Sequence, residues 1–156
     1  MAARKRIGDV YELVDGELIA LVQYIGKDST VAGSDVVEVI SPVPSDWMSS
    51  FPSLPRLFRA HVFLKAGETL KLWRRAGHQE VNEHAPQRWC TVPPQDLGRD
   101  ASSHWRVWTT GHPMAPASRD ADIEEAEFGY VMSPIQIAHR VRHGRYTHDL
   151  PRKLET

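Results

Sequence analysis

Residues 10–25 read VYELVDGELIALVQYI, and this stretch decides the fold class. Residues 10–14 are expected to form a short strand, and Asp15-Gly16 suits a type I′ hairpin turn, in which both central residues need positive φ. Residues 18–25 form an almost continuous apolar run, which is typical of a central strand buried on both faces. The sequence therefore predicts a β-hairpin at the start of the fold.

Further strand signals continue as far as residue 109. Residues 57–64 alternate between apolar and polar side chains, and Ala66-Gly67 predicts a turn directly after them. Gly77 is expected to end the strand that follows this turn. Alternation and β-branched residues together predict strands at residues 35–40, 57–64, 70–75, 88–92 and 105–109.

A proline-rich connection interrupts these strands. Residues 41–55 contain four prolines, each of which lacks the backbone donor that a helix or ladder needs. A short helix can begin near Ser45 or Asp46, since both residue types are favoured N-caps. We expect a surface connection that Trp47 and Met48 pin to the body of the protein.

The clearest helix start lies near the C-terminal end. Ser133 is a favoured N-cap, Pro134 fits the first helical position, and Gly144 suits the end of a helix that finishes in basic residues. An acidic run over residues 120–127 can also be helical after Ser118. The apolar face expected for the later helix consists of Ile135, Ala138 and Val141, with Ile137 beside it.

These elements predict a single α+β domain over residues 1–156. Its β-rich core is expected at about residues 5–110, and its helical segment at about residues 118–150. A twisted antiparallel sheet, SH3-like and partly closed in its N-terminal part, would pack against one C-terminal helix.

Composition excludes several classes of protein. With 156 residues, 41% of them hydrophobic, the chain can bury a core and is not a disordered one. A net charge of −1 lacks the basic excess of a general nucleic-acid binder. The basic start has no apolar stretch after it, and no apolar run is long enough for a membrane span. Cys90 is the single cysteine, so an intrachain disulfide is impossible and the cytoplasm is the expected compartment.

Three segments carry a resemblance to a known family. They are IGDVY at residues 7–11, FRAHVF at residues 58–63 and LWRRAGH at residues 72–78. With these segments the chain resembles the Imm26-like immunity proteins of bacterial polymorphic toxin systems over roughly residues 5–90. The resemblance implies a protein that binds a cognate toxin and blocks it, without catalytic residues or a cofactor of its own.

Two features are candidates for the toxin contact. The acidic run could steer and complement a cationic partner such as a nuclease toxin, although a solvated helix face explains it equally simply. An aromatic residue in the proline-rich connection could instead anchor an interface, because aromatic residues dominate binding hot spots. The candidate toxin-binding residues are Asp122, Glu124, Glu125, Glu127 and Trp47.

A metal site is the next alternative. His78, His84 and Cys90 are all residue types that ligate zinc. They are spaced six residues apart, however, which matches no closed zinc motif and places the two histidines on different faces of any helix. Cys90 is more simply explained as a small core residue.

Nucleic-acid binding is a further alternative. Lys71, Trp73, Arg74 and Arg75 combine an aromatic ring with cations, as strands that stack single-stranded bases do, and residues 105–108 repeat the pattern. Core tryptophans with arginines at the rim would give the same pattern.

The sequence therefore predicts, first, an immunity protein that occludes the active site of a toxin. A small β-barrel that binds single-stranded nucleic acid or peptide comes second, and a metal-dependent hydrolase third; oligomeric state stays open.

Overall fold

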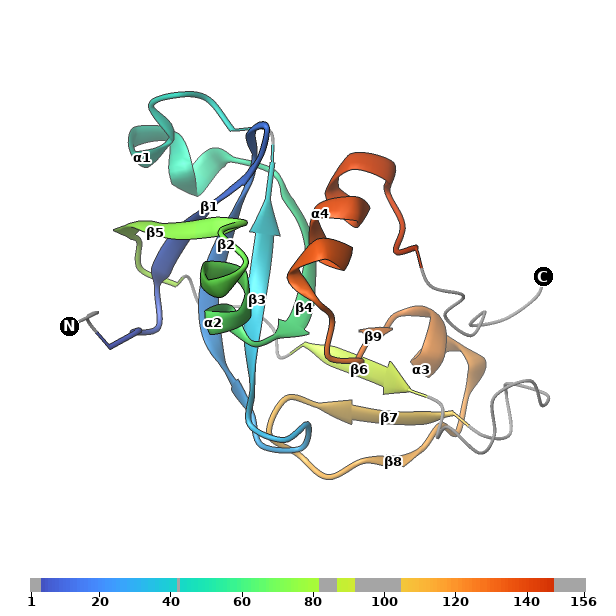
Figure 1. Ribbon diagram of the computed structural model, residues 1–156. Coiled ribbons are helices and arrows are strands. Elements are labelled where there is room, and N and C mark those ends of the chain that lie inside the picture. The colour runs from blue at the N-terminus through green and yellow to red at the C-terminus, as the bar shows by residue number, and fades with distance from the viewer. Residues whose placement is uncertain (1–3, 42, 82–86, 92–104, 148–156) are drawn as a thin grey trace.

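The computed structural model describes residues 4–41, 43–81, 87–91 and 105–147, and places their strands in two sheets (Figure 1). The larger sheet is antiparallel with the order β4-β3-β2-β1-β5, and the smaller has the order β8-β7-β6-β9. The larger sheet comprises β1 (Asp9–Asp15), β2 (Glu17–Asp28), β3 (Ser34–Ile40), β4 (Arg56–Val62) and β5 (Trp73–His78). The smaller comprises β6 (Arg88–Thr91), β7 (Arg106–Thr109), β8 (Ala115–Pro116) and β9 (Glu127–Phe128).

The helices of the described residues are short. They are α1 (Trp47–Ser50), the 3-10 turn η1 (Phe51–Ser53), α2 (Leu64–Thr69), α3 (Asp120–Glu124) and α4 (Pro134–His143). Each is too short or too polar to traverse a lipid bilayer. The predicted α+β class is confirmed.

The predicted hairpin is confirmed, but its turn differs from the expected type. Asp15 pairs with Glu17, and Gly16 between them has a φ of 76°. Asp15 keeps a negative φ, so the prediction of two positive φ values was wrong. β2 pairs with β1 on one side and β3 on the other, which confirms that it is a central strand.

The two faces of the larger sheet carry separate cores. Successive strand residues point to opposite faces, so Tyr11 and Val22 contribute to one core while Val10 and Leu21 contribute to the other. The first face packs against α2 and α4. On the second face, Trp47 and Phe51 of the proline-rich connection cover one region, and Trp89 and Trp108 of the smaller sheet cover another. The first core includes Tyr11, Leu13, Val22, Val37, Val39, Leu64, Trp73, Ile137, Ala138 and Tyr146.

The chain between β4 and β5 departs most from the predictions. Residues expected to end a strand and make a tight turn form α2 instead, and the strand expected at residues 70–75 begins only at Trp73. Gly77 lies inside β5 rather than ending it. Because α2 carries the chain across the sheet, β5 pairs with β1 and not with β4. The larger sheet is therefore open, and the expectation of a partly closed barrel was wrong.

The helix predicted at Ser133 is confirmed as α4. The Ser133 side chain accepts a hydrogen bond from the Gln136 backbone N–H at 3.3 Å, and Gly144 ends the helix with a φ of 76°. The buried face is shifted from the expected one. Ile137 is fully buried, whereas Ile135 is 58% exposed. α4 lies against the larger sheet and contributes to its first core (Figure 1).

A buried polar network at Asp28 joins the two sheets. The Asp28 carboxylate, at the end of β2, lies 2.9 Å from His61 Nε2 on β4 and accepts a 2.8 Å hydrogen bond from Trp108 Nε1 on β7. It also accepts backbone N–H groups of Thr30 and Gly111. Asp28 and His61 are both fully buried, and Trp89 lies against the imidazole ring with 4.0 Å between the ring centroids.

Acidification is expected to destabilise the protein through His61. Burial lowers the pKa of His61 below its usual 6.5, and the nearby Asp28 offsets this only in part. The unfolded chain then binds the proton more readily, so the free energy of unfolding should fall below pH 6.5 by at most about 1.4 kcal/mol per pH unit. Urea unfolding at pH 7.5 and 5.5 measures this. The His61→Gln variant should show a shallower decline, and an equal decline in both proteins would contradict the assignment to His61.

Candidate functional site

The β5 strand forms an open edge of the larger sheet. β5 pairs with β1 on one side, and no strand among the described residues pairs with its other side (Figure 1). An open edge presents backbone N–H and C=O groups that a further strand can use. β5 is therefore a place where an extended segment of another protein can add to the sheet.

The start of β5 is fixed by its packing against α2. The indole of Trp73 lies directly over Gly67, where a side chain would overlap the ring, and Trp73 Nε1 donates to the Leu64 carbonyl at 3.0 Å. Lys71 takes a positive φ of 57° between the helix and the strand. The bulge in the pairing of β1 with β5 falls at Ala76. β5 is thus held firmly at one end and locally bent at Ala76.

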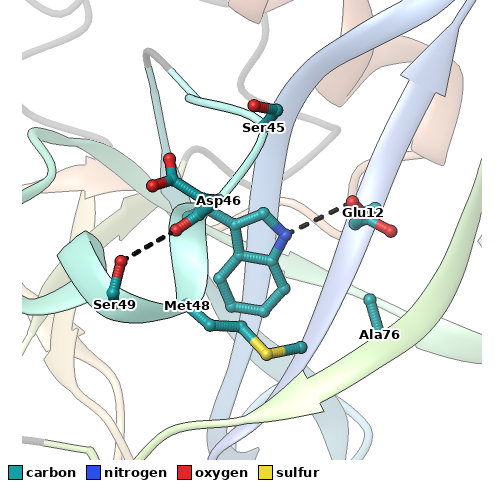
Figure 2. A pocket seen from close by; sticks show the side chains of 7 residues that line it. Glu12, Ser45, Asp46, Met48, Ser49 and Ala76 are labelled. Atoms are coloured by element: carbon teal, nitrogen blue, oxygen red, sulfur yellow. Dashed lines mark hydrogen bonds between the residues drawn. The ribbon is translucent and has the colours of Figure 1, made fainter.

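The first pocket beside β5, here called the Met48 pocket, lies between α1 and the strand (Figure 2). It has a volume of about 450 Å³. Trp47 Nε1 donates to Glu12 Oε2 at 3.3 Å across it, and Met48 is 53% exposed at its mouth. The pocket combines apolar atoms with the carboxylates of Glu12 and Asp46. Its lining residues are Glu12, Ser45, Asp46, Trp47, Met48, Ser49 and Ala76.

The second pocket, here called the arginine pocket, has a volume of about 540 Å³ and surrounds the buried Asp9. Burial by itself raises the pKa of Asp9. A 3.0 Å contact with His78 Nδ1, the Arg6 backbone N–H and the Arg75 charge outweigh this and hold the pKa below its usual value. Asp9 is therefore ionised near neutral pH. The lining residues are Arg4, Arg6, Asp9, Arg75, Ala76, Gly77 and His78.

A third pocket of about 420 Å³ lies at the other end of β5, next to α2. It is lined by Glu12, Val14, Glu68, Lys71, Leu72, Trp73 and Arg74. Taken together, the three pockets include every one of the six residues of β5 among their linings. The open edge is thus flanked by hollows along its whole length.

The acidic run is largely used inside the protein. Asp122 is buried and bonded to Arg119 at 3.0 Å and Arg88 at 3.3 Å. Glu127 forms a bidentate ion pair with Arg140, whose two terminal nitrogens donate to the two carboxylate oxygens at 2.8 and 3.1 Å. Of the four acidic candidates for toxin contact, Glu124 and Glu125 are exposed. Glu125 lies 4.0 Å from Arg88. These residues do not form a single free acidic surface.

The aromatic candidate, Trp47, is 3% exposed and belongs to a core. Trp47 is therefore not presented at the surface as an interface anchor, whereas its expected role in pinning the proline-rich connection is confirmed. Its neighbour Met48 is the side chain that protrudes. No pattern in the sequence distinguishes which of the two faces outward.

The three candidate metal ligands are dispersed or outside the described residues. His78 contacts Asp9 at the β5 edge, Cys90 is fully buried on β6, and His84 lies outside the residues that the structure describes. No cluster of three histidine, cysteine or acidic side chains with metal-binding geometry occurs in the described part of the chain. The interpretation of Cys90 as a core residue is confirmed.

The aromatic residues behind the nucleic-acid alternative are also buried. Trp73, Trp105 and Trp108 are 3%, 1% and 4% exposed, so none of them offers an indole face to a nucleic-acid base. The arginines beside them remain at the surface, with Arg74 having 80% of its side chain exposed. The alternation of tryptophan and arginine in the sequence therefore reflects tryptophans in the core with arginines at its rim.

A scan against models of known protein families gives no match, and neither the search of curated proteins nor the search of solved structures finds a similar chain.

Proposed function

We propose that this protein is a non-catalytic binding protein of the cytoplasm that neutralises a toxin by accepting an extended segment of it at the β5 edge. The single observation that carries the proposal is the open edge strand with pockets along its whole length. In strand addition, backbone hydrogen bonds supply affinity and side-chain pockets supply specificity. The described residues offer both parts at β5.

The resemblance to immunity proteins supports the choice of a toxin as partner. Two of its three segments, residues 7–11 and 72–78, form the start of β1 and the whole of β5. Those segments supply five of the residues that line the arginine pocket. The segments that carry the resemblance therefore coincide with part of the candidate site.

The exposed Met48 side chain provides a test of the proposed edge. We expect Met48→Glu to weaken partner binding by at least about tenfold, because it would place a charge against an apolar contact beside Glu12 and Asp46. Met114→Glu is the matched control, since Met114 is 42% exposed directly before β8, on the other sheet. Binding is measured by calorimetry with the partner recovered on the tagged protein from its native cells.

Neutralisation is tested with the same partner. Expression of the partner alone should arrest growth, and co-expression of the wild-type protein or Met114→Glu should restore it. Met48→Glu should restore growth only poorly. A partner that is harmless when expressed alone would contradict the toxin assignment, and equal binding by the two methionine variants would contradict the β5 edge.

A further inference from the structure

We infer that the segment added at β5 carries an acidic residue whose carboxylate enters the arginine pocket, followed or preceded directly by an apolar residue that faces the Met48 pocket. This inference rests on the proposed strand addition and specifies the chemistry of the partner. It is carried by the charge of the arginine pocket, by the unused donors of Arg75 and by the positions of the two pockets on opposite faces of the sheet.

The arginine pocket has an excess of positive charge. Three of its lining residues, Arg4, Arg6 and Arg75, are arginines and one, Asp9, is acidic, so the formal charges of the lining residues sum to +2 with His78 neutral. Arg4 and Arg6 are exposed, and the Arg6 guanidinium has no ion-pair partner among the described residues. The pocket therefore favours a carboxylate and disfavours a cation.

Arg75 keeps hydrogen-bonding capacity for such a carboxylate. Its Nε lies 3.4 Å from Asp9, one terminal nitrogen is 3.4 Å from the Tyr11 hydroxyl, and the other is 3.5 Å from the Arg4 carbonyl. These contacts are long and use three of the five N–H groups of a guanidinium. Two N–H groups of Arg75 are not used by these contacts and can donate to a carboxylate.

The charge on β5 also disfavours a second copy of this chain as the occupant. Arg74 and Arg75 are neighbours on the strand, so antiparallel pairing of two β5 edges would bring like charges together across the new ladder. Positive charges on an edge strand are a common means of preventing such self-pairing. An acidic segment would convert the same repulsion into attraction.

The two pockets lie on opposite faces of the sheet. Arg75, which lines the arginine pocket, pairs with Tyr11, and Tyr11 points into the first core. Glu12, which lines the Met48 pocket, follows Tyr11 in β1 and therefore points to the second face, where Trp47 lies. Ala76, at the bulge, lines both pockets. Adjacent residues of an extended segment point to opposite faces, so neighbouring residues of the partner would enter the two pockets.

A display library of random twelve-residue peptides, panned against the immobilised full-length protein, tests the inference. We expect enrichment of extended peptides with an acidic residue next to an apolar one. Their affinity should fall at least about tenfold in the Arg4→Gln/Arg6→Gln double variant, whose exposed positions leave the contact between Asp9 and Arg75 intact. Arg142→Gln, which removes an exposed cation paired with Asp15, is the control and should bind normally.

The outcomes separate this inference from the function on which it rests. Enriched peptides that lose binding in Met48→Glu but contain no preferred acidic residue, or contain lysine or arginine in its place, would overturn the inference and leave strand addition at β5 standing. A panel of peptides whose binding is unaffected by Met48→Glu would overturn strand addition at β5 and the inference together. Normal binding by the double variant would also overturn the inference.

Discussion

Replacement of Asp28 by alanine is expected to lower the free energy of unfolding by about 3–5 kcal/mol, since removal of one partner from a buried charged network leaves the others without compensation. The carboxylate is fully buried and serves donors on three separate parts of the chain. Its loss would leave the Trp108 indole N–H, the His61 ring and the backbone N–H of Gly111 without a partner away from water.

Urea unfolding of the wild-type protein and Asp28→Ala measures this loss. Asp46→Ala is the matched control, because Asp46 is an exposed aspartate at the start of α1 whose side chain makes no capping bond. We expect that control to change stability by less than about 0.5 kcal/mol. A loss below about 1 kcal/mol in Asp28→Ala would show that the network at Asp28 contributes little to holding the sheets together.

Gly67→Ala is expected to destabilise the protein by about 3 kcal/mol, although the same change in an exposed helix stabilises by about 1 kcal/mol. Gly67 lies in α2 with an ordinary helical backbone, so conformational freedom is not the reason for a glycine there. A Cβ at this position would overlap the Cδ2, Cε2 and Cζ2 atoms of Trp73. The indole must move, and the start of β5 must move with it.

A double-mutant cycle isolates that overlap. Trp73→Leu removes the ring, so Gly67→Ala in this background should be neutral or stabilising even though Trp73→Leu is itself destabilising. Lys65→Ala, at an exposed position of the same helix, controls for helix propensity. Equal effects of Gly67→Ala in the two backgrounds, measured by urea unfolding, would contradict the steric explanation.

Local patterns were sufficient to predict most of the elements. The apolar run of residues 18–25 specifies a central strand because both of its faces need apolar contacts, and β2 has both. Ser133, Pro134 and Gly144 bound α4 through capping chemistry that depends only on nearby residues. Such features can be read from a short window because the interactions that fix them are short in sequence.

The strand order could not be read in this way. The alternation of residues 57–64 followed by Ala66-Gly67 predicted a strand and a tight turn, and nothing in that window shows that residues 64–69 form a helix whose Gly67 packs under Trp73. That helix moves β5 to the far edge of the sheet. The candidate site depends on this placement, so the pattern of arginines at residues 74–75 was visible in the sequence while its position on an open edge was not.

The polar network was also beyond the reach of sequence patterns. Asp28 and Trp108 are eighty residues apart, and nothing in their local sequences marks them as partners. The acidic run over residues 120–127 did not predict a free acidic surface, for a related reason. A window of sequence shows that Asp122 and Glu127 are charged, but their use depends on Arg88, Arg119 and Arg140, two of which lie on other elements.

The position of α4 has a consequence for the order in which the protein can complete its fold during translation. All five strands of the larger sheet have been synthesised once the ribosome has added His78. Ile137, Ala138 and Tyr146, which are added later, belong to the core on the first face of that sheet. At typical elongation rates of 5–20 residues per second, roughly 3–14 s pass before those residues are synthesised. During that interval apolar side chains of the nascent sheet, such as Val37 and Val39, lack the contacts that α4 and Tyr146 later provide.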